Sequence, residues 1–304
     1  MTRKRKFQKK DLSLLLIALP ALLYLLINNY VPMLGIFIAF KNLDFSKGIF
    51  ASPWCGLQNF EFLFKTKDAW IMTRNTILYN LVFIVVGTIL SIALAVLLCE
   101  VAGKLASKLF QEALILPNLI SIIIVSYIVY AFLNSDTGLV NHFLESIGGN
   151  PVSWYMESKY WPIIISIVFI WKNVGYNSII YVAGISGIDK SIYEAAQIDG
   201  AGKFKQIFKI TVPMIMPTVI MMTLLSIGRI MSSDFGLFYQ VPMNSGALYA
   251  TTQTVDTYVY RALMQMQDFG MSSAAGLFQS VIGFILVLFS NYIVRKKSAE
   301  NALF

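Results

Sequence analysis

Six separate stretches of the sequence are long and apolar enough to cross a lipid bilayer as helices. A bilayer core about 30 Å thick needs about 20 apolar residues at helical rise. Lipid offers no hydrogen-bond partner to an exposed backbone group, so single runs of this kind form helices. The predicted spans are residues 12–29, 76–98, 113–133, 161–184, 213–231 and 274–294. We therefore expect an all-α integral membrane protein with six transmembrane helices.

The composition agrees with a membrane protein. Of the 304 residues, 57% are hydrophobic and only 13% are charged, and the mean hydropathy is +0.67. A soluble domain of this length needs more polar surface. The net charge of +8 comes largely from short basic clusters beside apolar runs, such as residues 3–6 and 295–297. Such clusters are typical of cytoplasmic flanks of membrane helices, so we do not expect a nucleic-acid partner.

The basic N-terminus is followed by an apolar stretch, as in a signal peptide. The apolar part runs from Leu12 almost unbroken to Phe40, which is much longer than a secretory core, and no small-x-small cleavage site follows it. The stretch is therefore interpreted as a retained first helix. Pro20 inside it and Pro32 just beyond it predict a kink and an early end.

The distribution of Lys and Arg predicts the orientation. With the N-terminus inside, the cytoplasmic segments contain 15 of these residues and the external segments contain seven. The positive-inside rule then favours two cytoplasmic termini, although five of the seven lie in the first external loop, at 41–74. A second long external stretch, at 234–271, is expected to be partly helical.

We divide the chain into three parts. Residues 1–72 comprise the cytoplasmic N-terminal tail, the first helix and an external loop. Residues 73–294 form a five-helix transmembrane domain that contains a cytoplasmic loop at 187–213, and residues 295–304 form a cytoplasmic tail. Small residues at helical spacing predict close helix packing in this domain. They are Gly87, Ser91 and Ala95 in the second span, and Gly276 and Gly283 in the last.

The loop at 187–213 contains signals for a short helix. Asp189 can cap its first turn, and Ser191 followed by Glu194 fits a capping box. Gly200 offers a left-handed stop. A helix of about two or three turns is too short to be stable alone, so it needs a partner surface.

A second short helix is expected before Pro213, where the fifth span starts. Phe204, Ile207 and Phe208 share one face of it, whereas the lysines of this segment project elsewhere. Such a segment is expected to lie along the inner membrane interface.

The pattern Glu194-Ala195-Ala196, Gly200, Ile210 and Val212-Pro213 resembles the EAA loop of type I ABC importer permeases. The family has Leu where this chain has Val212. The resemblance implies that the short helix is a coupling helix seated in a cleft of an ATPase subunit. The coupling residues carried over are Tyr193, Glu194, Ala195, Ala196, Asp199, Gly200 and Ala201. Alanines allow close approach of a partner, and a glutamate can form a charge-assisted hydrogen bond to its Arg or Lys.

Further motifs extend the resemblance over nearly the whole chain. Residues 53–60 and 74–76 are similar to the entry into the core of carbohydrate-importing permeases. Leu19-Pro20, residues 30–35 and Asp256-Thr-Tyr-Val-Tyr-Arg261 look like polysaccharide-type permeases of Gram-positive bacteria. The resemblance implies a type I ABC importer permease fold in the plasma membrane and an oligosaccharide or other carbohydrate as substrate.

The resemblance also implies the partners, which are two copies of an ATPase subunit, a second homologous permease that is a different chain, and an extracellular solute-binding protein. ATP and Mg are expected on the ATPase, because this chain has no phosphate-binding loop ending in Gly-Lys-Ser/Thr. Its two Gly-Lys pairs, at 103–104 and 202–203, are followed by Leu105 and Phe204. No cofactor is expected on this chain.

Polar and aromatic residues in or near the spans are candidates for the substrate path, because polar groups are costly in a membrane and sugars bind aromatic faces. Lys172 and its neighbour Asn173 interrupt the fourth span. The path candidates are Trp171, Asn173, Tyr176, Arg229 and Asp234. Alternatively, Arg229 reaches an interface or pairs with Asp234, and the aromatic residues form interfacial belts.

The sequence does not favour an enzyme. No triad, paired-carboxylate site or metal cluster is evident, and the single histidine, His142, is interpreted as an exposed loop residue. Two alternatives stay open, an ion-coupled secondary transporter and an ABC importer of a non-sugar solute. The spans contain almost no acidic residue of the kind that ion coupling needs.

Overall fold

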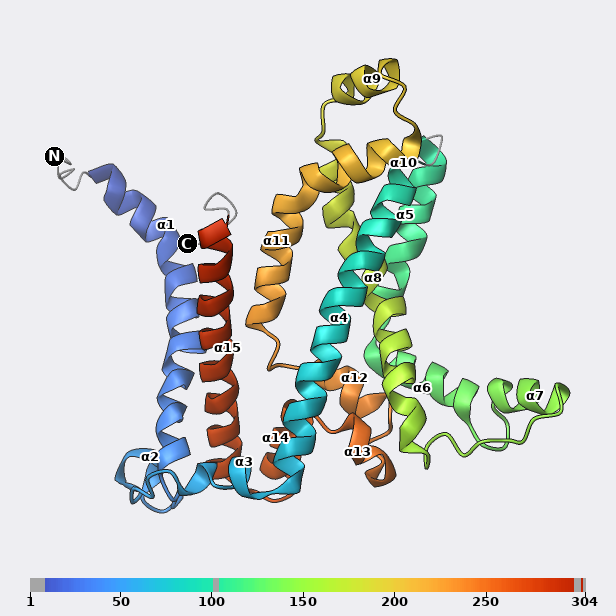
Figure 1. Cartoon of the computed structure of the whole chain (residues 1–304). Helices are drawn as coiled ribbons and strands as arrows, with labels where there is room; N and C mark the ends of the chain where they lie inside the picture. Colours follow the sequence, from blue (N-terminus) through green and yellow to red (C-terminus); the bar gives the residue numbers. More distant parts are fainter. Residues whose placement is uncertain (1–8, 101–103, 298–301, 303–304) are drawn as a thin grey trace.

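The computed structural model describes residues 9–100, 104–297 and 302. In these ranges every element of regular secondary structure is a helix, and there is no strand (Figure 1). Five helices are long and apolar enough to cross a membrane, and a sixth crossing results if a bent helix pair is counted as one span. The predicted all-helical membrane fold is confirmed. Apart from the first span and the bent pair, which are described below, the long helices are α4 (Lys67–Glu100), α8 (Trp161–Ser186), α11 (Val212–Gly228) and α15 (Phe269–Lys297).

The first span is continuous from Leu15 to Phe40. It consists of α1 (Lys9–Leu25), a π turn η1 (Leu26–Tyr30) and a 3₁₀ helix η2 (Val31–Phe40). The expected early end is therefore wrong. Pro32 falls in the first turn of η2, where its missing N–H is not needed, so the change of helix type accommodates the proline. The start of α1 tilts away from the rest of the span, as expected with Pro20 inside it (Figure 1).

The third predicted span is not a straight helix over 113–133. Instead, α5 (Lys104–Leu119) ends, and α6 (Ile122–Leu133) leaves at an angle of 91°. Ser121 between them has the extended backbone angles φ −56° and ψ 139°. The continuous apolar run hid this break, because every residue of α6 fits a membrane helix by composition alone.

Helices α4 and α8 pack along each other, and small residues of α4 lie in their contact. Ser91 and Ala95 are fully buried, and Ser91 Oγ donates to the Val174 carbonyl at 3.3 Å. Nearer the start of α4, the rings of Phe83 and Phe169 stack at 3.7 Å. The predicted close packing of this face of α4 is confirmed.

The two glycines predicted on one face of α15 differ. A methyl group at Gly283 would lie 3.0 Å from the Gly228 carbonyl oxygen, so α11 and α15 approach closely there. A methyl group at Gly276 would meet nothing within 4 Å. The expectation of close packing is confirmed for Gly283 and is wrong for Gly276.

The loop after the first span forms a small cap with short helices. Its elements are α2 (Gly48–Ala51), η3 (Gln58–Phe60) and α3 (Phe62–Lys65). The Asn59 side-chain amide lies within 3.0–3.3 Å of the carbonyl oxygens of Ile38, Ala39 and Lys41. These carbonyls lie at the end of η2 or just after it, where no further helical turn follows, so Asn59 closes the helix end, and the Ile38 carbonyl also accepts from the Lys41 N–H.

A second cap is built from the stretch after α11, which is partly helical as predicted. It contains α12 (Phe235–Gln240), η6 (Gly246–Leu248), α13 (Tyr249–Thr252) and α14 (Val255–Met264). Buried polar side chains of α4 hold it: Asn75 Nδ2 donates to the Gln253 carbonyl at 3.0 Å, and Thr76 Oγ1 accepts from the Val255 N–H at 3.0 Å. The motif at 74–76 therefore joins α4 to this cap.

The segment between α6 and α8 forms an arm that leaves the bundle sideways (Figure 1). Its helices are α7 (Leu139–Ser146) and η4 (Ser158–Tyr160). His142 lies in α7, not in a loop, and its side chain is exposed with Nδ1 3.8 Å from Glu145 Oε2. The interpretation of His142 as an exposed residue is confirmed, but the expected loop is a helix.

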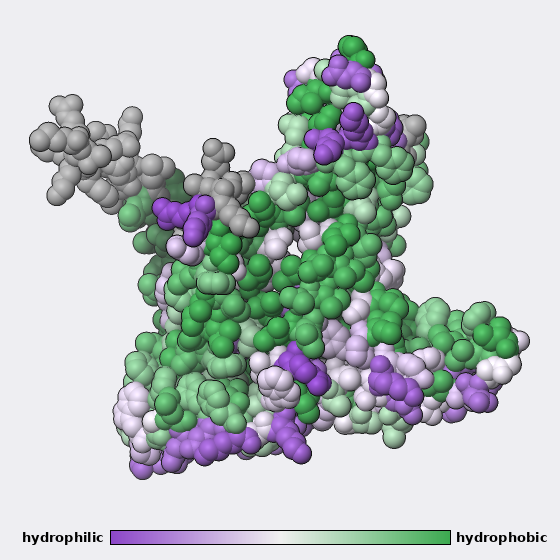
Figure 2. All heavy atoms as spheres, in the orientation of Figure 1, coloured by the Kyte–Doolittle hydropathy of each residue, from purple (hydrophilic) through white to green (hydrophobic). Residues whose placement is uncertain are grey.

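The two ends of the molecule differ. The start of α1, the end of α15 and the loop helix α9 (Lys190–Ile198) lie at one end, and both caps lie at the other (Figure 1). Hydrophobic residues cover the surface between these ends, whereas hydrophilic residues gather at the ends (Figure 2). This matches the predicted topology. That the α9 end faces the cytoplasm stays a prediction, as does the division of the chain at 72 and 294.

Candidate functional site

The first candidate site is α9, and its sequence explains both of its ends. Asp189 caps the start by accepting a hydrogen bond from the Ser191 N–H at 2.9 Å. This bond lowers the pKa of the Asp189 carboxyl. Gly200 follows the helix with φ +74°, a left-handed conformation that suits glycine, and the Ala201 N–H closes the end on the Ala196 carbonyl at 2.8 Å. The predicted cap by Asp189 and stop at Gly200 are confirmed.

The alternative capping box of Ser191 with Glu194 is not formed. Ser191 lies inside the helix rather than at its cap, because Asp189 occupies that position. Glu194 is left exposed, so its carboxylate is available to another molecule.

Helix α9 protrudes from the bundle (Figure 1) and buries none of its residues against the rest of the described chain. Glu194 and Ala195 are exposed, Ala196 is half-buried, and the apolar side chain of Ile198 is 87% exposed. Of the predicted coupling residues after α9, Asp199 and Gly200 are exposed as well, and Ala201 is half-buried. An isolated helix of nine residues is unstable in water, so this surface suits a partner.

The base of the α9 loop is tied to the membrane helices. Tyr193 Oη lies 2.9 Å from Thr211 Oγ1, and Thr211 is the last residue of η5 (Ile207–Thr211), which leads into α11. Lys203, the first residue of α10 (Lys203–Gln206), pairs with Glu100 at the end of α4 at 2.7 Å. These two contacts join the α9 loop to α11 and α4.

The predicted second short helix is present but is continuous with the fifth span. Together α10, η5 and α11 form one helical run, Lys203–Gly228, which is longer than the predicted 213–231 at its start. Phe204 and Phe208 are exposed on it, and Gln206 is buried, with Nε2 donating to the Ala201 carbonyl at 2.8 Å. The exposed phenylalanines agree with a face toward lipid, and the interfacial location stays a prediction.

The second candidate site is a cavity of about 460 Å³ among α4, α8 and α11. Its lining combines aromatic and apolar residues with the polar side chains of Asn80, Asn177, Arg229 and Asp234. Such a mixture can bind a polar solute by hydrogen bonds and ring contacts. The structure thus brings together two of the predicted path residues, Arg229 and Asp234.

Arg229 and Asp234 do not pair with each other. Within the described ranges, the Arg229 side chain has no ion pair or hydrogen bond. Asp234 instead caps α12 by accepting from the Leu237 N–H at 3.1 Å. Asn80 Nδ2 donates to the carbonyls of Ile230 and Ser232 at 3.0 Å. These bonds hold the segment between α11 and α12, which carries both Arg229 and Asp234.

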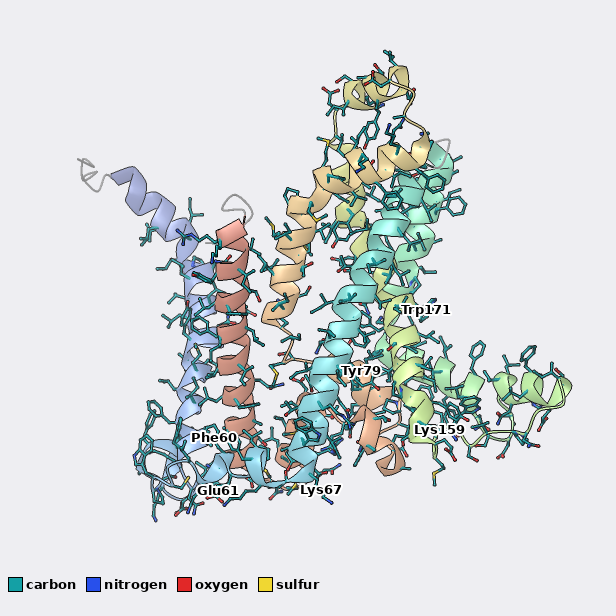
Figure 3. All side chains as sticks on the ribbon, viewed as in Figure 1. Phe60, Glu61, Lys67, Tyr79, Lys159 and Trp171 are labelled. Carbon is teal, nitrogen blue, oxygen red and sulfur yellow. The ribbon has the colours of Figure 1, made fainter. Side chains whose placement is uncertain are left out.

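Three predicted path residues lie outside this cavity. Trp171, which Figure 3 labels on α8, is 45% exposed, and Tyr176 is 52% exposed. Asn173 faces α5, and its Oδ1 accepts a hydrogen bond from Asn118 Nδ2 at 3.3 Å. The assignment of these three residues to a substrate path stays a prediction, and it requires a path along the surface of α8.

Lys172 has a role that sequence reasoning missed. Its ammonium donates to the carbonyl oxygens of Pro117 at 3.3 Å and Asn118 at 3.0 Å, and also to that of Ile120. These carbonyls lie at the break between α5 and α6, where the helical turns end, and of the three only the Pro117 carbonyl also accepts a backbone N–H of a described residue, that of Ile120 at 3.4 Å. Lys172 therefore caps the end of α5 and opposes its negative dipole end. The only signal in the sequence was a lysine in the middle of an apolar span.

The broken helix supports the cavity. Ile122, the first residue of α6, contacts α12, since a methyl group at Gly236 would lie 2.9 Å from Ile122 Cγ2. Helix α12 in turn begins after Asp234. Lys172 thus positions α6, and α6 positions the segment that carries Asp234.

Within the described part of the chain, no three His, Cys, Asp or Glu side chains lie close enough to hold a metal ion.

Known proteins with similar sequences and folds are components of transport systems. A family model described as "Binding-protein-dependent transport system inner membrane component" matches residues 48–299. The chain belongs to this family. Its members are inner-membrane components of transport systems, and the permease described here crosses the membrane several times.

Two relatives from Bacillus subtilis (strain 168) are similar over almost the whole permease. The protein LplB is 33% identical over 293 residues, which cover 96% of this chain and 92% of LplB. The polygalacturonan/rhamnogalacturonan transport system permease protein YteP is also 33% identical, over 298 residues, with 97% and 90% covered.

A solved structure shares the fold of the permease. It is a chain of a bacterial ABC transporter involved in the import of the acidic polysaccharide alginate, with a TM-score of 0.87 and 32% identity. The match covers 95% of this chain and 97% of that chain. The predicted type I ABC importer permease fold is confirmed by this match.

Proposed function

We propose that the permease forms half of the translocation pathway of an ATP-driven carbohydrate importer and docks to a separate ATPase through α9. The observation that carries the proposal is an exposed helix, too short to be stable alone, that is joined to the spans by a half-buried side-chain contact. Helix α9 buries no residue of its own, yet Tyr193 contacts Thr211 at the entrance to α11. This is the arrangement that a force-transmitting helix needs.

The proposed complex contains two copies of the ATPase, a second permease that is a different chain, and an extracellular solute-binding protein. A related alginate transporter was solved in complex with an alginate pentasaccharide-bound periplasmic protein, which supports the last of these partners. ATP and Mg are bound by the ATPase and not by this chain. The location is the plasma membrane of a Gram-positive bacterium, in line with the two Bacillus subtilis relatives.

An acidic oligosaccharide is the substrate class that fits the cavity. Arg229 brings a guanidinium without an ion pair among the described residues into a cavity that also contains Asn80 and Asn177. Arg binds carboxylates in a bidentate manner, and uronic acids carry carboxylates. The names of YteP and of the alginate transporter refer to acidic polysaccharides, which supports the same class.

The transport cycle follows from two states of the helices. ATP binding closes the ATPase pair and moves α9 as a lever. The contact of Tyr193 with Thr211 and the pair of Lys203 with Glu100 carry the displacement into α11 and α4. The cavity between these helices and α8 then changes its accessible side. Because the two states differ in their affinity for nucleotide, ATP shifts the population.

The proposal is tested by uptake into proteoliposomes that contain the full complex and the solute-binding protein. We expect uptake of labelled oligogalacturonate only with ATP, and weaker uptake of a neutral oligosaccharide of equal length. Uptake that persists without the ATPase and follows an imposed ion gradient would instead indicate a secondary transporter. Uptake of a non-sugar solute alone would contradict the substrate class.

A further inference from the structure

A second pocket lies in the cap at the end opposite α9. It has a volume of about 350 Å³ and is lined by residues from the start of α4, from α13 and from α14. The polar residues of its lining are Asp68, Tyr249, Gln253, Tyr258, Arg261 and Gln265. None of them lines the cavity of Arg229, so the pocket is separate from that cavity.

Arg261 is the unusual member of this pocket. Its side chain is only 9% exposed, and its guanidinium lies over the ring of Tyr249 with 4.1 Å to the centroid. Nη1 donates a weak hydrogen bond to Asn244 Oδ1 at 3.4 Å. Nη2 is buried and has no hydrogen-bond partner in the part of the chain that the structure describes. Burial lowers the pKa of this guanidinium.

A buried cation without a counter-ion is unfavourable unless an anion joins it. No carboxylate of the described residues forms an ion pair with Arg261. Stacking on Tyr249 fixes the plane of the guanidinium, so Nη2, which has no acceptor among the described residues, is held in place for an acceptor that enters the pocket.

We propose that this pocket receives a carboxylate side chain of the extracellular solute-binding protein when that protein docks. The inference rests on the proposed function. Two observations favour a protein side chain over the transported sugar: the pocket is separate from the polar cavity, and it lies in the cap, away from α9.

Asp68 is the one acidic residue in the lining, in the first turn of α4. Its charge faces the same pocket, so an incoming carboxylate has to compete with it for Arg261. Removing this charge is therefore expected to strengthen docking, whereas removing the Arg261 charge weakens it.

The test measures the affinity of the purified solute-binding protein for the complete transporter in nanodiscs. For Arg261→Met we expect a dissociation constant raised about 30-fold or more, the effect of removing one partner of a buried charge pair. The control is Lys159→Met, which removes a positive charge that is exposed at the same end of the molecule (Figure 3). This control is expected to change the constant about twofold or less, as for a charge at a rim. Asp68→Asn is expected to lower it.

A second measurement leaves Arg261 in place, in case the Met variant does not fold. Met266 lines the same pocket and is exposed, so Met266→Cys can be labelled in a chain whose Cys55 and Cys99 are replaced by Ser. A negatively charged thiol reagent should occupy Arg261 and block docking. A positively charged reagent of the same size should block it much less. Equal effects of the two reagents would contradict the proposal.

The remaining outcomes are separable. Unchanged affinity of the Arg261→Met complex would show that Arg261 is a structural cation only. Unchanged affinity with a loss of uptake confined to acidic sugars would assign the carboxylate to the substrate and overturn the proposal. If the wild-type complex does not bind the solute-binding protein at all, the proposed function itself fails. If the wild-type complex binds the solute-binding protein and the Arg261→Met complex binds it equally well, only this inference fails.

Discussion

Tyr193 Oη and Thr211 Oγ1 lie 2.9 Å apart and form the contact between α9 and the helix that lines the cavity. Thr211 is buried, and Tyr193 is half-buried. The two residues are 18 positions apart, and the loop between them contains the Gly200 turn. This contact connects the protruding helix α9 to the bundle, and it is the basis of the first prediction.

Tyr193→Phe should uncouple transport from ATP hydrolysis. Removal of the hydroxyl leaves the ring and the ATPase-facing side of α9 in place, so hydrolysis continues while uptake per ATP falls several-fold. Thr211→Val should have the same effect, and the double variant should be no worse than either single one, because both remove one bond. Tyr292→Phe is the control, since Tyr292 is exposed on α15. Additive effects of the two substitutions would contradict the link.

Lys172→Met should destabilise the permease by about 2 kcal/mol or more, because it leaves carbonyl groups at the α5–α6 break without a donor. The measurement is the midpoint of thermal unfolding in detergent. Lys205→Met, which removes an exposed lysine from α10, should leave that midpoint nearly unchanged. A stable Lys172→Met protein would mean that the break does not depend on this cap.

Gly175→Ala should disturb the packing of α5 on α8. A methyl group at Gly175 would lie 2.0 Å from the Leu114 carbonyl oxygen, and backbone cannot yield as a flexible side chain does. We expect a cost of about 1–3 kcal/mol in the free energy of unfolding. Gly276→Ala is the matched control, because its methyl group has nothing within 4 Å. Equal stability of the two variants would contradict the close approach of α5.

The stability of α9 should depend on pH, because Asp189 caps it. Its folded pKa lies below the ordinary value, because the Ser191 N–H donates to the carboxylate. The cap therefore stabilises α9 fully at a pH above the unfolded pKa of about 4 and is lost as the pH falls through the lower folded pKa. The protection factors of the α9 amides, which compare the observed exchange rate with the intrinsic rate at each pH, should fall over that acidic range. Asp189→Asn, which keeps an acceptor without a titrating group, should not show this transition.

Sequence patterns predicted α9 well because its determinants are local. A cap residue, a short helical run and a glycine with positive φ are all within a few residues of one another, and the structure places Asp189 and Gly200 in these roles. The long spans α4, α8 and α15 were predicted for a similar reason, since continuous apolar composition is sufficient for a membrane helix.

The features that were missed depend on contacts between distant residues. The break after α5 is stabilised by Lys172, which lies more than 50 positions later in the chain. The end of the first span at Phe40, and not near Pro32, depends on Asn59 in the following cap. Of the path candidates, Asp234 caps the start of α12, and Lys172, which the sequence showed only as an interruption of the fourth span, closes the end of α5.

The most direct test of the account is the amount of ATPase that is isolated with the tagged permease. Glu194→Lys reverses an exposed charge on α9, so the permease itself should still fold and insert. We predict that this variant isolates little or no ATPase, whereas Lys209→Glu, a charge reversal of equal size outside α9, isolates as much as the wild type. Full recovery of the ATPase with Glu194→Lys would contradict docking through α9.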